Sequence, residues 1–127
     1  MNYKELIVWQ KAHASTLKTI KIAERARRSY AADIIVKQLI RASTSVGANI
    51  AEGYGRHEGK EYIRFLQIAF GSSNEVDNWL NVLKDAGLMG NEITLELIRD
   101  NEEILKILTT MIKKIKSNGK MGSRARA

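Results

Sequence analysis

The sequence of 127 residues contains no cysteine, no proline and only two histidines. Without cysteine the chain can form neither a disulfide bond nor a thiolate-ligated metal site. It also lacks an apolar run of the roughly 18 residues that a membrane-spanning helix needs. Residues 1–14 carry charges and end in no small-residue cleavage site, which is unlike a signal peptide. We therefore expect a cytoplasmic protein without a membrane partner.

The apolar residues that are present recur at steps of three and four, and no segment alternates in the manner of a strand. This spacing predicts four helices, over about 4–27, 32–52, 58–86 and 94–116. A single domain of this length with short connections is typical of an all-α, antiparallel up-down-up-down four-helix bundle. Residues 117–127 lack an apolar period and predict a flexible basic tail.

Each predicted helix carries one stripe that we expect to face the core. The stripes are Leu6, Trp9, His13, Leu17, Ile20 and Ala23; Ile35, Leu39, Ala42, Val46 and Ile50; Tyr62, Phe65, Ala69, Ser72, Val76, Trp79 and Leu83; and Asn101, Ile104, Leu108, Met111 and Ile115. Gly87 is expected to end the third helix in the left-handed conformation. Thr94 is expected to cap the fourth, with Ile93 and Ile98 as a hydrophobic staple.

Further apolar residues lie off these stripes, in the first and third helices. They are Ile7, Val8, Ile22, Ile63, Ile68 and Phe70. A bundle helix needs only one buried stripe, so the surplus predicts a second buried face and a homo-oligomer.

The net charge of +7 is concentrated at the two chain ends. Residues 1–28 carry seven Lys/Arg and two acids, and residues 113–127 carry six Lys/Arg and no acid, whereas the segment between them has a net charge of −4. Such clustering favours a nucleic-acid partner, RNA or DNA, although an ordinary lysine-rich surface is the alternative.

The topology divides these cations between two poles. The start of the first helix, the turn between the second and third, and the end of the fourth should meet at one pole, and Arg25, Arg27 and Arg28 should lie at the other. The candidate nucleic-acid-binding residues are Lys4, Lys11, Lys18, Lys21, Arg25, Arg27, Arg28, Arg56, Lys60, Lys113, Lys114 and Lys116.

The stretch SVGANIAEGYGR, residues 45–56, concentrates three glycines and several polar groups in a helical context. Gly47 is expected to allow close packing against Gly71, and Gly53 and Gly55 to end the second helix through positive φ. The polar side chains step along one helix face and predict a hydrogen-bonded network, with a ligand-binding or catalytic site as the alternative. Its members are Gln38, Arg41, Ser45, Asn49, Glu52 and Glu75.

The sequence offers little for catalysis. His13 is expected in the core or an interface, and His57 in a solvated turn, so neither is placed as a base beside a nucleophile. We expect no metal site and no cofactor, because neither a converging ligand set nor a Walker-type phosphate loop is present. GYGRHEGK is a weak phosphate-contact signal, and Tyr54 could stack on a base or pack on the bundle end.

The segment QLIRASTSVGANIAEGYGRHEGKEYIRFLQIAFGSSNEVDNWL, residues 38–80, and LIVWQKA, residues 6–12, resemble the signature of the 23S rRNA intervening sequence proteins, also called S23 ribosomal proteins. The signature positions carried over are Arg41, Ser45, Asn49, Glu52, Gly53 and Arg56. Ile40 departs from the pattern, which has an arginine there, and its loss weakens a phosphate-gripping role for this face.

The resemblance implies a small helical bundle, typically a homopentamer, that is not an enzyme. It also implies a relation to the accessory proteins of diversity-generating retroelements, in which a basic pentamer binds nucleic acid and a reverse transcriptase. Our first hypothesis is a non-enzymatic oligomer that binds structured RNA. The alternatives are a scaffold that docks a reverse transcriptase or ribonucleoprotein, and an enzyme built around Glu52, Arg56, His57 and Glu61.

Overall fold

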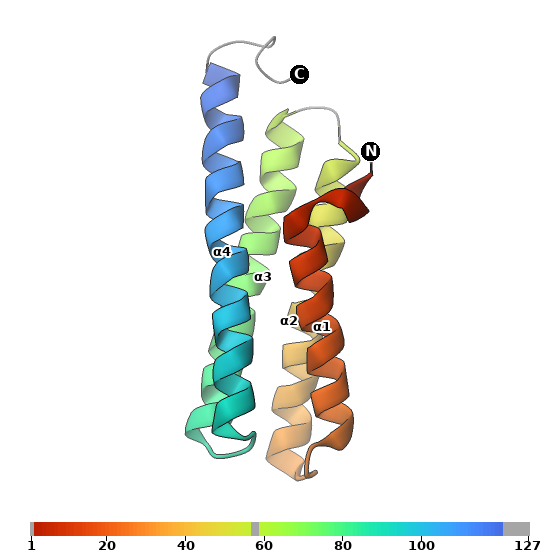
Figure 1. The fold of residues 1–127 in the computed structure, drawn as a ribbon, viewed down its shortest axis with the longest axis vertical. Helices are drawn as coiled ribbons and strands as arrows, with labels where there is room; N and C mark the ends of the chain where they lie inside the picture. Colours follow the sequence, from red (N-terminus) through yellow and green to blue (C-terminus); the bar gives the residue numbers. More distant parts are fainter. Residues whose placement is uncertain (1, 57–58, 121–127) are drawn as a thin grey trace.

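The computed structural model describes residues 2–56 and 59–120. It contains a 3-10 turn η1 (Tyr3–Glu5) and four helices, α1 (Ile7–Arg25), α2 (Tyr30–Tyr54), α3 (Gly59–Asp85) and α4 (Asn91–Lys120), and no strand occurs within these residues. Successive helices run in opposite directions (Figure 1). The predicted all-α four-helix fold is confirmed.

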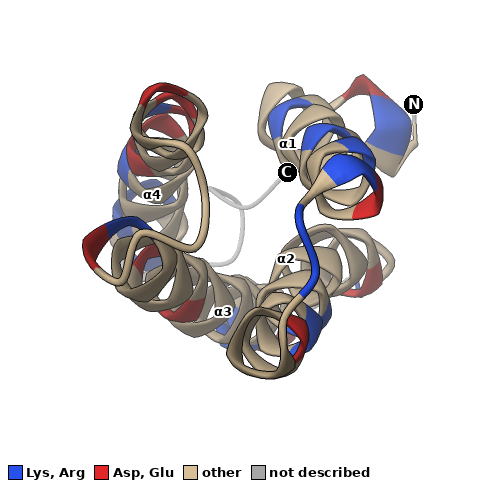
Figure 2. Ribbon diagram, turned by 90° about the horizontal axis from the view of Figure 1, so that it is seen from below, with Lys and Arg blue, Asp and Glu red and all other residues tan. Residues whose placement is uncertain are grey.

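The short connections between the helices lie at two ends of the bundle, an upper and a lower pole (Figure 1). At the upper pole α1 begins, α2 connects to α3, and α4 ends (Figure 1). At the lower pole lie the α1–α2 and α3–α4 connections. Viewed from the lower pole, neighbours in sequence are neighbours in space (Figure 2). The described helices hold no segment long and apolar enough to cross a membrane.

The start of the chain differs from the continuous first helix that the spacing predicted. Asn2 and Glu5 form a capping box around η1, and Leu6 is then extended, with φ −72° and ψ 127°. The helix proper therefore begins at Ile7. The second helix begins earlier than predicted, because the Ser29 side chain accepts a hydrogen bond from the Ala32 amide and caps it.

Gly87 ends α3 as predicted, with φ +70°. The Leu88 amide donates to the Leu83 carbonyl and the Gly87 amide to the Lys84 carbonyl, which is the Schellman pattern. The predicted cap of α4 is wrong. The helix begins at Asn91, so Thr94 lies inside it and its hydroxyl donates to the Gly90 carbonyl at 2.7 Å.

The end of α4 also differs from the sequence prediction. The helix continues to Lys120, so residues 117–120 belong to the bundle rather than to the predicted tail. The remainder of that predicted tail, residues 121–127, lies outside the described residues.

The core is formed mainly by leucines of α2, α3 and α4, including Leu39, Leu66, Leu83, Leu97 and Leu108, each at most 1% exposed. Burying each such side chain contributes about 1.5–3 kcal/mol relative to leaving it in water. The predicted stripes of α2 and α4 are largely confirmed. In α3 the fully buried residues also include Leu66, Ser73 and Leu80, each next to a predicted position that is only half-buried.

In α1 the predicted buried face is only partly correct. The core side is formed by the smaller residues Val8, Ala12, Ser15 and Thr19. Of the predicted stripe, Leu6 and Trp9 are half-buried and pack against the core, whereas His13 is exposed, and Leu17 and Ile20 are 48% and 37% exposed. Because α1 is apolar on two faces, periodicity alone could not choose between them.

A buried polar pair joins α3 to α4 inside this core. The Ser73 hydroxyl donates to Asn101 Oδ1 at 2.6 Å, and Asn101 Nδ2 donates to the Ser73 carbonyl at 2.8 Å. Both residues are at most 2% exposed, and leaving either unpaired would cost about 1–3 kcal/mol. The pair therefore fixes the register of the two helices.

The glycines of the 45–56 stretch play other roles than predicted. Gly53 lies within α2 and is buried, and a Cβ there would be 2.8 Å from Phe65 Cβ and 3.1 Å from Tyr62 Cδ1. Gly55 caps α2 with φ −72°, so neither residue uses positive φ. A Cβ added at Gly47 would lie 3.6 Å from Trp9 Nε1 of α1, and one added at Gly71 would meet no atom of another element within 4 Å, so these two glycines do not bring α2 and α3 together.

We predict opposite effects for two glycine substitutions in helices. Gly53→Ala should lower the free energy of unfolding by about 1–2 kcal/mol, because overpacking costs about 1–3 kcal/mol and only part of it is offset by helix propensity. Gly71→Ala should raise it by up to about 1 kcal/mol, since its added methyl meets nothing. Urea unfolding of both variants checks this. A Gly53→Ala protein as stable as Gly71→Ala would contradict the close approach.

Candidate nucleic-acid interface

The upper pole brings together chain segments that are far apart in the sequence. The first residues of η1, the last turn of α2, the first turns of α3 and the last turns of α4 all lie there (Figure 1). Of the predicted binding residues, Lys4, Arg56, Lys60, Lys113, Lys114 and Lys116 lie in these segments, and all are exposed. The structure thus places half of the predicted cations at one end of the bundle.

Two arginines at this pole share one aromatic ring. The guanidinium carbon of Arg56 lies 5.1 Å from the centroid of Phe65, and that of Arg64 lies 4.6 Å from it. Arg56 also donates to Glu52 at 2.8 Å, and Arg64 to Glu61 at 3.3 Å. A guanidinium held over a ring and by one carboxylate is oriented while retaining other donors for a phosphate oxygen.

Tyr54 packs against Tyr62 beside these arginines. The two rings meet edge to face with centroids 6.3 Å apart. Burial raises the pKa of Tyr62, with a smaller contribution from Tyr54, so its hydroxyl stays protonated at neutral pH. Of the two predictions for Tyr54, packing on the bundle end is the one observed in this structure.

The lysines of the upper pole, unlike its arginines, form no ion pair with another described residue. Within residues 2–56 and 59–120, no ion pair is formed by the side chains of Lys4, Lys60, Lys113, Lys114 or Lys116. Three of them, Lys113, Lys114 and Lys116, lie within about one turn near the end of α4 and are exposed. Their charge is available to an anionic partner.

Lys11 and Lys18 are used differently, in ion pairs from α1 to α4. Lys11 Nζ lies 2.9 Å from Glu103, and Lys18 Nζ lies 2.5 Å from Glu96 and 2.8 Å from Asp100. Hydrogen bonds to Asp100 and then Glu96 raise the pKa of Lys18 above its ordinary value. These two lysines bridge the α1–α4 side of the bundle.

The remaining predicted cations lie away from the upper pole. Arg25 ends α1, and Arg27 and Arg28 lie in the α1–α2 connection at the lower pole (Figure 2). Arg28 forms a two-pronged pair with Asp33, whose pKa it lowers through hydrogen bonding. Lys21 is exposed on α1 between the two poles.

The predicted polar network exists in part. Arg41 donates to Gln38 and to Glu75, and Glu75 also accepts from the Trp79 indole at 3.0 Å. Ser45 and Ser72 share a hydrogen bond of 2.9 Å between α2 and α3.

The other two members of the predicted network do not reach α3. Asn49 donates back to Ser45 within α2, and Glu52 binds only Arg56. The predicted tie between the α2–α3 turn and α3 is therefore made by Phe65 and Arg56, and the network itself lies further down the two helices.

The described residues hold no group of three or more His, Asp or Glu side chains able to bind a metal. His13 is stacked on Trp9, with centroids 4.6 Å apart, but is exposed, so of the two predicted places for it, core or interface, the core is wrong and the interface stays a prediction. His57, part of the alternative catalytic site, and the adjacent Glu58 lie outside the described residues.

Comparison with known families gives a match over most of the chain. Residues 4–110 match the model of the 23S rRNA-intervening sequence protein family. The chain belongs to this family. The match covers all of α1, α2 and α3 and most of α4, which confirms the resemblance found in the sequence.

A crystal structure from the same family is similar in fold. It is a protein of unknown function from the S23 ribosomal protein family of Bacteroides thetaiotaomicron VPI-5482, 26% identical, with a TM-score of 0.78. The alignment covers 84% of this chain and 99% of that one. No curated protein sequence matches the chain.

The sequence analysis did not predict the roles of Arg64 and Phe65 at the upper pole. Phe65 was expected in the core, and Arg64 was not among the binding candidates. The signal was present, because Arg64 lies one helical turn after Lys60 and Glu61 in the first turns of α3. What the sequence could not provide was the position of Arg56 over the same ring.

We predict that Arg41 and Glu75 are coupled. A double-mutant cycle of Arg41→Ala and Glu75→Ala should give a coupling free energy of about 0.5–1 kcal/mol, since the pair is partly exposed. Glu75→Ala alone should also shift the Trp79 fluorescence, because it removes the indole's acceptor. Unfolding in urea and emission spectra measure both. Additive single effects would show that the pair contributes nothing.

Proposed function

We propose that this protein is a non-enzymatic, homo-oligomeric nucleic-acid-binding protein whose upper pole binds the phosphates of structured RNA. The observation that carries the proposal is the arrangement of Arg56 and Arg64 over Phe65, at the same pole as α4 lysines that form no ion pair within the described residues. Oriented guanidiniums give directed phosphate contacts, and mobile lysines add sequence-independent attraction.

Binding of this kind is mostly electrostatic, and its signature is a strong dependence on salt. We predict that labelled hairpin RNA binds more weakly as salt rises. Lys113→Ala/Lys114→Ala should reduce the slope of log affinity against log salt by roughly 1.5, because two phosphate contacts are lost. Fluorescence anisotropy over a range of salt concentrations measures the slope.

The matched control for this experiment is Arg99→Ala/Lys106→Ala. It removes the same charge from exposed positions of the same helix, away from its last turns. The control should retain the wild-type slope. Equal slopes for all three proteins, or no binding at low salt, would overturn the proposal. The RNA should remain intact throughout, and hydrolysis that Glu52→Ala abolishes without unfolding would favour the enzymatic alternative.

The proposed oligomer is supported by the outward face of α1. Leu17 and Ile20 leave large apolar side chains in water, 48% and 37% exposed. A second copy covering this face would remove that surface from water. The family resemblance adds a pentamer as the expected size, which would bring several basic poles together and raise avidity.

We predict that Leu17→Ser/Ile20→Ser lowers the molar mass in solution to that of a single chain. Both side chains are partly exposed and outside the core, so the helical circular dichroism should stay close to that of the wild type. Light scattering coupled to size exclusion measures the mass. A wild-type protein that is already monomeric would contradict the oligomer.

The second candidate function is a scaffold that docks a reverse transcriptase or a ribonucleoprotein. It uses the same basic surface to bind an acidic or nucleoprotein partner. Binding to the purified partner without nucleic acid, in the absence of affinity for RNA alone, would favour it.

A further inference from the structure

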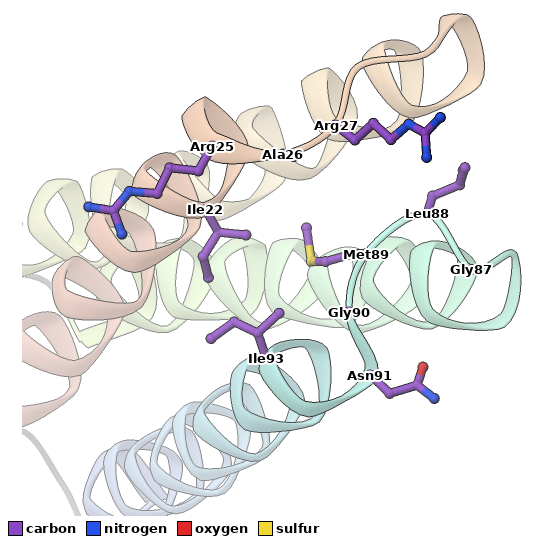
Figure 3. Close-up of a pocket in the computed structure, with 10 residues that line it drawn as sticks. All are labelled: Ile22, Arg25, Ala26, Arg27, Gly87, Leu88, Met89, Gly90, Asn91 and Ile93. Carbon is purple, nitrogen blue, oxygen red and sulfur yellow. The ribbon is translucent and has the colours of Figure 1, made fainter.

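A groove at the lower pole has no part in the proposed RNA interface. It lies between the end of α1 and the α3–α4 connection, and its volume is about 560 Å3. That is within the range of about 300–1,000 Å3 typical of ligand-binding sites in proteins. Figure 3 shows Ile22, Met89 and Ile93 reaching into it from three different segments.

The floor of the groove is aliphatic. Ile22, Leu88, Met89 and Ile93 provide branched and flexible side chains, and no aromatic residue is among those that line the groove. Met89 is a pliable wall that can adapt to differently shaped apolar groups. Without an aromatic platform the groove offers nucleic-acid bases nothing to stack on.

The rim is cationic. The guanidinium groups of Arg25 and Arg27 lie at opposite ends of the groove (Figure 3). In the part of the chain that the structure describes, neither side chain forms an ion pair or a hydrogen bond, whereas Arg28 next to them is bound by Asp33. Two exposed arginines without a protein partner in the described residues therefore border an aliphatic floor.

From this combination we infer that the groove docks a segment of a partner protein in which aliphatic residues alternate with aspartate or glutamate. The aliphatic side chains fill the floor, and the carboxylates pair with the two arginines. The chain's own basic end cannot be the occupant, because α4 ends at the opposite pole and residues 113–127 contain no acid. This site is independent of the proposed RNA-binding function.

The test uses a capped, fluorescently labelled synthetic peptide in which leucines alternate with glutamates. We expect saturable binding to the full chain, weakened about five- to tenfold by Arg25→Ala/Arg27→Ala through the loss of two partly exposed ion pairs. Arg99→Ala/Lys106→Ala, with the same charge change elsewhere, should bind as the wild type does. Lys113→Ala/Lys114→Ala should also leave peptide binding unchanged, which separates this site from the RNA interface.

Two peptide controls separate charge from apolar contact. Replacing the leucines by serine, or the glutamates by glutamine, should weaken binding in each case. Amide chemical-shift changes on adding the parent peptide should cluster at Ile22, residues 87–90 and Ile93, which locates the site without any substitution.

Three results would overturn the inference. The first is no peptide binding at millimolar concentration, and the second is equal binding by the Arg25→Ala/Arg27→Ala protein. The third is a lower molar mass in solution for the Arg25→Ala/Arg27→Ala protein than for the wild type. That result would show that a second copy of the chain fills the groove.

Discussion

At Gly53 the backbone of α2 lies so close to α3 that no larger residue fits without displacement, since a Cβ would be 2.8 Å from Phe65 Cβ. This approach fixes Phe65 against the last turn of α2. Arg56, placed just after that turn, then lies over one ring with Arg64 of α3. The positions of Arg56 and Arg64 at the upper pole therefore depend on Gly53, because only a residue without a Cβ lets α2 and α3 approach this closely.

The two poles of the bundle carry cations of different kinds. At the upper pole, arginines are oriented by a ring and by acids, and the lysines nearby are unpaired within the described residues. At the lower pole, two arginines that have no partner among the described residues border an aliphatic groove. Between them, Lys11 and Lys18 are paired with acids of α4 and hold the two outer helices together. The cations at these three levels along the helices therefore differ in their surroundings, and we propose a different role for each level.

The sequence predicted the number of helices and the core faces of α2 and α4, because each of these helices has one dominant apolar stripe. It could not predict which face of α1 is buried, because Val8 and Ala12 lie on one apolar face of this helix and Leu17 and Ile20 on another. It also assigned Gly53 to a turn, since a glycine near a helix end suits a turn and a close helix contact equally well. Contacts with Tyr62 and Phe65 show that Gly53 makes a close helix contact. Both residues lie in α3, so the sequence around Gly53 carries no sign of them.

The central claim is that RNA contacts the upper pole. Amide chemical shifts of the isotopically labelled protein, followed during titration with hairpin RNA, test it most directly. The account predicts changes concentrated at Arg56, Lys60, Arg64 and residues 113–116, with little change at the lower pole. Changes confined to the groove beside Arg25 and Arg27, or to the outward face of α1, would contradict it.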